Sequence, residues 1–217
     1  MKRRAWKGRF IVFEGIDGSG TTTQATLAAA ALRADGFRVL QTREPSDRPI
    51  GTLIRQALQG RIGLPGSDQP LTEETLALLF AADRLDHLEA EILPALRPGQ
   101  LVICERYLLS SLAYQGAACS IDWVEQINAG AIIPDLTIFL EVKPADASCR
   151  RAARGSTREL FEGDERQRRV SRQYRAAIAR LAKRERILVL DGGKPVDQVA
   201  AEAQKAIRQL AARSAVG

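Results

Sequence analysis

The stretch FEGIDGSGTTTQ, residues 13–24, sets three glycines between a hydrophobic run and an alanine-rich run. Gly15, Gly18 and Gly20 follow the strand-like residues 9–15 and precede a helix-like segment. A strand, a tight glycine turn and a helix N-terminus form a phosphate-binding loop, whose N–H groups and helix dipole attract an anion. A simple strand-to-helix turn would show the same glycines, so the loop alone leaves both interpretations open.

The loop departs from the usual pattern G-x-x-x-x-G-K-[ST] because Thr21 stands at the lysine position. That lysine ordinarily contacts the β- and γ-phosphates of a nucleotide. Thr21 can donate a hydrogen bond but carries no charge, and loss of a charge-assisted contact typically costs about 1.5–3 kcal/mol. Thr22 stands where a hydroxyl ligates Mg²⁺. Three interpretations follow: a site without its cation, a site whose cation comes from elsewhere, or a chance group of glycines.

Short β-rich runs alternate with helical runs along the rest of the chain. The predicted strands are residues 9–15, 37–44, 100–107, 135–142 and 186–192. The predicted helices are residues 21–35, 49–59, 71–97, 121–130, 144–154, 164–184 and 195–213. Strands separated by helices need crossover connections, which place helices on both faces of a parallel sheet. We therefore expect an α/β fold in a single domain over residues 1–217.

The composition narrows the class of protein. Hydrophobic residues make up 45% and charged residues 27% of the chain, which is typical of a globular protein, and no apolar run approaches the roughly 18 residues of a membrane span. Three cysteines without a C-x-x-C pair and a single histidine argue against a disulfide framework, a zinc site and a histidine triad. We expect a cytoplasmic protein without membrane contact.

The net charge of +6 would suit nucleic acid. However, the arginines gather around a few motifs, and the chain shows no basic stripe and little aromatic interleaving. A polyanionic small molecule fits this distribution better than nucleic acid does.

Four further stretches, together with the loop, carry a resemblance to a known family. They are TREP (42–45), LLFAADRLDHL (78–88), ICERYLLSSLAYQG (103–116) and PDLTIFLEV (134–142). In this order and spacing they resemble bacterial and archaeal thymidylate kinases, from about residue 9 to residue 200. The resemblance implies a P-loop kinase fold: a five-stranded parallel sheet with helices on both faces and a short lid at about 150–166. It also implies phosphoryl transfer from ATP to dTMP with Mg²⁺, for dTTP synthesis and DNA replication, by a homodimer.

Phe80 and Arg84 are four residues apart, so they share one face of the predicted helix. An aromatic ring and a guanidinium at this spacing can stack on a flat base and donate to its edge carbonyl. The resemblance implies that they stack on thymine and donate to its O4. The pattern alone fits equally well with a core phenylalanine and a solvated arginine.

The resemblance also implies which residues contact the sugar and the phosphate of the acceptor. Arg106 ends a predicted strand at the carboxyl edge of the sheet, where open α/β sheets bind ligands. It is the implied catalytic clamp on the dTMP phosphate, and Arg43 is expected to join it, since a guanidinium fork suits a phosphate dianion. Asp17 is implied to accept from the 3′-hydroxyl and to help position the acceptor phosphate, and Tyr114 to exclude ribose. The positions implied near the thymine N3 edge are Ser111 and Gln115.

For the phosphoryl donor, the resemblance implies that the loop and the lid bind ATP. The implied ATP-binding residues are Gly15, Ile16, Asp17, Gly18, Ser19, Gly20, Thr21 and Thr22. The implied Mg²⁺ contacts are Thr22 and Glu105, although Glu105 is one methylene longer than the family's usual aspartate. Catalytic lid arginines are expected to supply the charge that Thr21 lacks; in order of preference they are Arg154, Arg151 and Arg158. A solvated arginine-rich helix is the alternative for this segment.

Several functions remain open at this point. The first is an active dTMP kinase, and close to it stands a kinase for dUMP or for a deoxynucleoside, although a deoxynucleoside has no phosphate for Arg106 to hold. The alternative from another class is a catalytically silent nucleotide-binding protein that lost its chemistry with the loop lysine. A decayed enzyme has no physical reason to keep the acceptor and lid residues together. We therefore expect an active enzyme that binds ATP and dTMP.

Overall fold

A computed structural model describes residues 6–63, 70–153 and 160–212 of the chain. The strands in these ranges are β1 (Arg9–Glu14), β2 (Val39–Arg43), β3 (Leu101–Glu105), β4 (Leu136–Glu141) and β5 (Ile187–Asp191). All neighbouring strands are parallel, in the order β2-β3-β1-β4-β5. The predicted five-stranded parallel sheet is confirmed, and each strand lies inside its predicted range.

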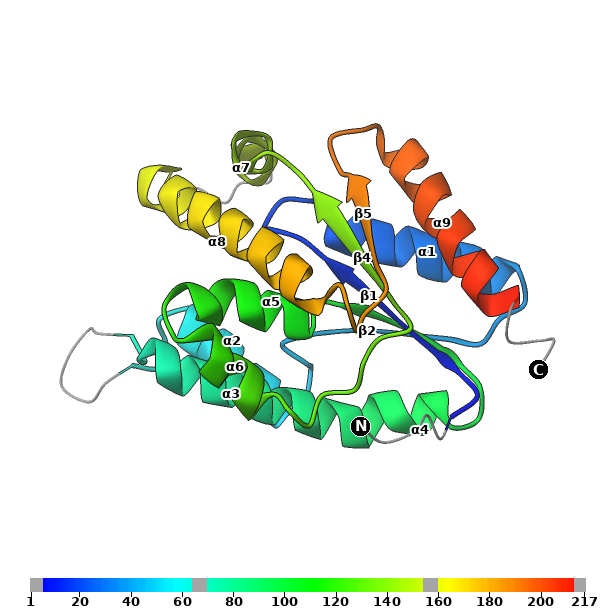
Figure 1. Cartoon of the computed structure of the whole chain (residues 1–217), viewed down its shortest axis with the longest axis horizontal. Coiled ribbons are helices and arrows are strands. Elements are labelled where there is room, and N and C mark those ends of the chain that lie inside the picture. Colours follow the sequence, from blue (N-terminus) through cyan, green and yellow to red (C-terminus); the bar gives the residue numbers. More distant parts are fainter. Residues whose placement is uncertain (1–5, 64–69, 154–159, 213–217) are drawn as a thin grey trace.

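Helices cover both faces of this sheet (Figure 1). Those that the sequence predicted are α1 (Thr21–Ala34), α2 (Pro49–Leu58), α3 (Glu73–His87), α4 (Leu93–Leu96), α6 (Ile121–Ile127), α7 (Pro144–Ala153), α8 (Leu160–Leu181) and α9 (Val196–Ala212). None of the helices in the described part of the chain combines the length and the hydropathy that a membrane crossing requires.

Strand β1 contributes side chains to a separate hydrophobic core on each face of the sheet. Phe10 and Val12 face the core formed with α4, α8 and the segment after β3, whereas Ile11 and Phe13 face the core formed with α1 and α9. All four side chains are fully buried. Because both faces are covered, the strand reads as a continuous hydrophobic run rather than as an alternating one.

One helix was missed by the sequence prediction. Residues Leu108–Tyr114 form α5, and a 3₁₀ turn (Gln115–Ala117) follows it. The helix has only seven residues and no capping side chain, so it carries neither an N-terminal signal nor a long periodic pattern. It packs against α8, and tertiary packing of this kind stabilises helices that are too short to form alone.

The other differences concern boundaries. The predicted helix over residues 71–97 contains a π-helical turn, Leu88–Ile92, between α3 and α4. Pro94 stands in the first turn of α4, and its missing N–H and its ring explain a local change of hydrogen bonding just before it. Helix α8 begins at Leu160, four residues before the predicted start at residue 164.

Candidate functional site

The glycine loop joins the end of β1 to the start of α1. Gly18 and Gly20 have φ values of 88° and 97°, in the left-handed region that favours glycine. A Cβ at Gly18 would lie 2.4 Å from the carbonyl oxygen of Ala147, so α7 packs directly against the loop. Gly20 precedes α1 and provides no capping side chain. The first N–H groups of α1 are therefore suited to an anion from outside the chain.

Both threonines at the start of α1 contact Glu105 at the end of β3. Thr21 Oγ1 and Thr22 Oγ1 each donate to Glu105 Oε1 at 2.6 Å. Thr21 is buried, whereas Thr22 is exposed. The structure thus brings together Thr22 and Glu105, the expected Mg²⁺ contacts, and hydroxyl and carboxylate oxygens are donors that suit this hard cation. These two residues would hold Mg²⁺ here.

Arg106 lies beside the loop in an unusual backbone conformation. Its φ is 65°, and non-glycine residues in this region are often found at functional sites. The guanidinium donates to Asp17 Oδ1 at 2.6 Å and to the carbonyl oxygen of Gly15 at 3.1 Å. It also lies over the Tyr114 ring, 5.2 Å from the ring centroid. Arg106, Asp17 and Tyr114, all predicted for the acceptor, therefore lie together.

Glu14 is completely buried and is linked to Arg106 by two hydroxyl groups. Its carboxylate accepts from Ser110 Oγ at 2.5 Å, from Tyr174 OH at 3.1 Å and from the Tyr107 amide at 2.9 Å. Arg106 Nη1 donates to the same Ser110 and Tyr174 hydroxyl oxygens, each at 3.3 Å. Burial raises the pKa of Glu14 to about 7, although hydrogen bonds from Ser110 and the charge of Arg106 oppose this shift. Ser110 thus belongs to the support of Arg106 and does not cap α5.

This buried carboxyl predicts a pH dependence of stability. The folded-state pKa of Glu14 lies above the usual value of 4.5, so the folded protein binds this proton more tightly than the unfolded chain does. The contribution of this proton to the free energy of unfolding is fully present below pH 4.5 and is lost as the pH rises through about 7. From pH 5 to pH 8 the loss amounts to roughly 2–3 kcal/mol.

We expect Glu14→Gln to remove this loss. The free energy of unfolding is measured with denaturant at pH 5 and at pH 8. The difference between the variant and the wild type should shift in favour of the variant by roughly 2–3 kcal/mol from the lower to the higher pH. Glu185, whose pKa burial also raises to about 7, remains in both proteins; the charge of Glu14 is a smaller cause of that shift, so most of the Glu185 contribution is common to the two proteins. A difference between the two proteins that is the same at both pH values would contradict the prediction.

A cavity of about 220 Å³ opens beside Arg106 and holds most of the predicted acceptor residues. Those that line it are Asp17, Phe80, Arg84, Arg106, Ser111, Tyr114 and Gln115. They come from the loop after β1, from α3 and from the segment after β3, which are far apart in the sequence. The cavity is therefore the candidate acceptor site.

Arg84 is held rigidly at this cavity. Its side chain is only 2% exposed, and Nη2 donates to Glu44 Oε2 at 2.6 Å and to Ser111 Oγ at 3.0 Å. Nη1 donates to Asn128, and the guanidinium lies over the Tyr107 ring. Nε is buried and has no hydrogen-bond partner among the described residues. Because an unpaired buried donor is costly, a ligand carbonyl in the cavity would be a favourable partner.

Several site residues were not singled out from the sequence. They are Glu14, Glu44, Asn128, Gln167 and Tyr174. Gln167 on α8 donates from Nε2 to Asp17 Oδ2 at 3.0 Å, and its Oε1 is buried without a partner in the described part of the chain. The sequence signal for Glu14 and Glu44 is an acidic residue at the end of a predicted strand. Asn128 at the end of α6 and the two residues on α8 had no local signal, since only the fold brings Asn128 to Arg84 and α8 to the loop.

Arg43 does not join Arg106, contrary to expectation. Its Nη2 pairs with Asp47 at 2.8 Å, its side chain is 58% exposed, and it does not line the acceptor cavity. Neighbouring strand residues point to opposite faces, and Thr42 is the one that turns inward, with Oγ1 2.7 Å from His87 Nε2. The end of β2 therefore directs Arg43 toward solvent.

Among the expected lid arginines, the described residues include Arg151. Its Nη1 donates to the carbonyl oxygen of Asp17 at 2.7 Å, so it lies against the phosphate loop. Arg154 and Arg158 lie outside the described residues. The neighbouring Arg150 donates from Nη2 to the carbonyl oxygen of Gly192 at 2.9 Å, which connects α7 to the segment after β5.

Comparison with known proteins relates these motifs to one family. A family model described as thymidylate kinase matches residues 13–203. The probable thymidylate kinase of Pyrococcus abyssi is 45% identical over 183 residues, which are 84% of this chain and 88% of that relative. The thymidylate kinase of Thermomicrobium roseum is 42% identical over 198 residues, 88% of this chain and 90% of the relative. That of Alkalilimnicola ehrlichii is 37% identical over 215 residues, 95% of both chains.

Proposed function

Because this chain belongs to the thymidylate kinase family, we propose that it transfers the γ-phosphoryl group of ATP to dTMP, giving dTDP and ADP. The observation that carries the proposal is the cavity in which Phe80 and Arg84 lie near Arg106 and Asp17. The proposal includes Mg²⁺ as the cofactor, dTTP synthesis for DNA replication as the role, and the cytoplasm as the location.

Phosphoryl transfer depends mainly on positioning and electrostatics, and the proposed acceptor side supplies both. The guanidinium fork of Arg106 suits the dianionic phosphate of dTMP. Its contacts with Asp17 and with the hydroxyl groups of Ser110 and Tyr174 hold this fork before the substrate arrives. Asp17 would accept from the 3′-hydroxyl, and the Tyr114 ring would pack against C2′.

On the donor side, residues 15–22 would bind the phosphates of ATP through backbone N–H groups. Thr22 and Glu105 would hold Mg²⁺, which neutralises charge on the β- and γ-phosphates. Arg151 is our choice for the fixed cation that Thr21 does not provide, supported by its contact with the loop. Arg154 and Arg158 stay predictions from the sequence.

An assay of ADP release with four acceptors tests the proposed function. Turnover should be fastest with dTMP and absent with thymidine, since thymidine has no phosphate for Arg106. dCMP should be a poor acceptor, because its base lacks the O4 carbonyl, and the rate with dUMP would measure the breadth of the site. A protein that binds ATP but releases no ADP with any acceptor would be the silent nucleotide-binding protein.

Phe80 and Arg84 predict how the base is recognised. Phe80→Ala should weaken dTMP binding by about 1–3 kcal/mol, the contribution of a base–aromatic stack. Arg84→Lys keeps a charge beside Glu44 but loses the Nε donor, so it should raise the KM for dTMP and reduce discrimination against dCMP. Steady-state kinetics with both acceptors measures these effects.

Phe37→Ala is the matched control for the stacking variant, because Phe37 is exposed and lies outside the cavity. It should leave the KM for dTMP unchanged. An unchanged KM in both Phe80→Ala and Arg84→Lys would remove these two residues from the acceptor site.

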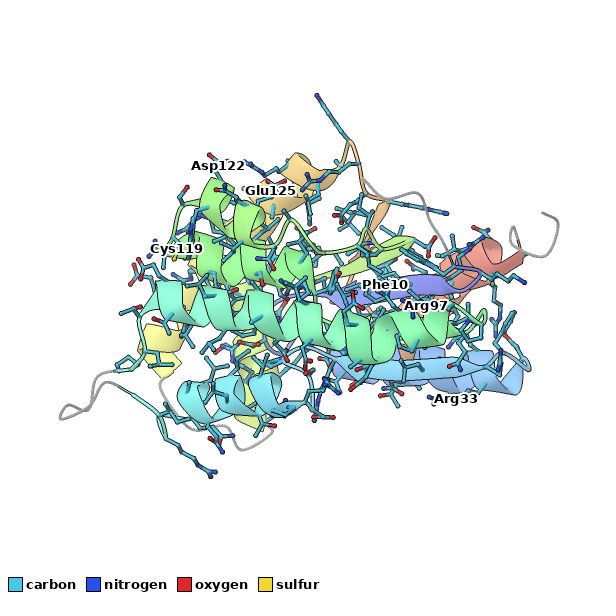
Figure 2. The ribbon with its side chains drawn as sticks, turned by 90° about the horizontal axis from the view of Figure 1, so that it is seen from below. Phe10, Arg33, Arg97, Cys119, Asp122 and Glu125 are labelled. Carbon is cyan, nitrogen blue, oxygen red and sulfur yellow. The ribbon has the colours of Figure 1, made fainter. Side chains whose placement is uncertain are left out.

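We also propose that two copies assemble through α2 and α3. These helices lie side by side at the surface (Figure 2). Leu53 on α2 is 38% exposed, and Leu78 and Leu85 on α3 are 51% and 45% exposed. Leu78 and Leu85 are seven residues apart and share one face, which a second copy would cover. Sedimentation equilibrium should give the mass of two chains, and a monomer at micromolar concentration would exclude this dimer.

A further inference from the structure

Glu105 lies at the phosphate loop and forms no ion pair with any residue that the structure describes. Both of its recorded side-chain contacts are to neutral hydroxyl groups, those of Thr21 and Thr22, and both reach the same oxygen, Oε1, at 2.6 Å. Hydrogen bonds from neutral donors orient a carboxylate but leave its net charge in place. A full negative charge is therefore held in a fixed orientation where the donor nucleotide is expected.

The residue at position 21 explains why this charge is unneutralised. A phosphate loop usually has lysine here. The flexible side chain of such a lysine is long enough for its ammonium group to reach neighbouring oxygens. The Thr21 hydroxyl already contacts Glu105, so a longer cationic side chain at this position would pair with the carboxylate. Thr21 makes the contact without the charge.

The described arginine side chains around Glu105 contact other groups. Arg43, which lies opposite Glu105 in the register of β2 and β3, pairs with Asp47. Arg106 donates to Asp17, to the Gly15 carbonyl and to the hydroxyls of Ser110 and Tyr174. Arg151 donates to the Asp17 carbonyl. The cation available to Glu105 is then the one that the nucleotide brings with it.

We propose that Thr21 and Glu105 form a matched pair that makes this site hold its divalent cation more tightly than the same site with lysine at position 21. Thr21 is a positioning residue in this pair. From the buried side it fixes Oε1, while Oε2, to which no described residue donates, stays available to the cation or to its water. The proposal rests on the proposed function, because it concerns the metal that accompanies ATP.

Manganese binding in the presence of ADP tests the pair without any turnover. The fraction of bound Mn²⁺ is measured by electron paramagnetic resonance for the full chain and its variants. Thr21→Lys should weaken Mn²⁺ binding at least tenfold, because the new ammonium pairs with Glu105 and repels the metal. Thr23→Lys adds the same charge two residues along α1 and should change Mn²⁺ affinity less than twofold. Thermal unfolding of each variant confirms that it is folded.

Two further variants separate charge from position. Thr21→Val keeps the shape but removes the hydroxyl, so it should weaken Mn²⁺ binding only a few-fold. Glu105→Gln removes the charge, and in that background Thr21→Lys should cause little further loss, so the two effects are strongly non-additive. Two results would contradict the proposed pair. One is additive effects of Thr21→Lys and Glu105→Gln on Mn²⁺ affinity, and the other is equal Mn²⁺ affinity in the Thr21→Lys and Thr23→Lys variants.

The kinase assay is run separately on the wild-type protein. A wild type that phosphorylates dTMP but shows additive Mn²⁺ effects overturns this inference and leaves the proposed function intact. A wild type without kinase activity overturns the proposed function, and the Mn²⁺ comparison still decides whether Thr21 and Glu105 act together.

Discussion

Arg106→Gly is expected to lower kcat/KM for dTMP by about 10³-fold, the range found when a group aimed at developing charge is removed. The guanidinium is the cation closest to Asp17 in the acceptor cavity, at 2.6 Å, and it is oriented by Ser110 and Tyr174. Glycine is the informative replacement because the φ of 65° at this position is strained for any other side chain. The variant therefore loses the side chain without adding strain to the backbone.

Two comparisons identify the cause of this loss. Arg106→Lys keeps a positive charge but not the two-pronged geometry, so it should recover only a small part of the activity. Arg97→Ala removes an exposed arginine from the far end of α4 (Figure 2) and should leave kcat/KM unchanged. If Arg106→Gly kept the wild-type kcat/KM, the acceptor phosphate would have to bind elsewhere.

Arg151→Ala is expected to lower kcat by about 10³-fold or more with little change in dTMP affinity. Thr21 brings no charge to the moving phosphoryl group, and Arg151 lies against the loop with Nη1 2.7 Å from the Asp17 carbonyl. An arginine that addresses the transferred phosphoryl group acts in the transition state, so its loss appears in kcat rather than in acceptor binding. Single-turnover rates and the Kd for dTMP separate the two effects.

Arg172→Ala is the matched control, because it removes an exposed arginine from α8 that does not line the acceptor cavity. It should leave both kcat and the Kd for dTMP unchanged. An unchanged kcat in Arg151→Ala would exclude this residue as the replacement for the lysine charge. The same assay would then be applied to Arg154 and Arg158.

The backbone architecture and the common face of Phe80 and Arg84 were accessible from local sequence. Strands buried on both faces appear as short hydrophobic runs, and the helices between them require parallel crossovers, so the five-stranded sheet could be predicted before the structure. The pair Phe80 and Arg84 could be recognised for the same reason, because a spacing of four residues places two side chains on one helical face. Both signals depend on residues close together in the chain.

Contacts between distant segments needed the tertiary structure. The short helix α5 depends on its packing against α8, and the support of Arg106 by Glu14 and Tyr174 depends on the hydrogen bond that joins α8 to β1; no local pattern encodes either contact. The outward direction of Arg43 depends on the orientation of β2, and the contact of Thr21 with Glu105 depends on the alignment of β1 beside β3. Composition and periodicity determine which residues form each element. The direction in which a polar side chain points at the end of a strand follows from the neighbouring strands and helices, and these come together only in the folded chain.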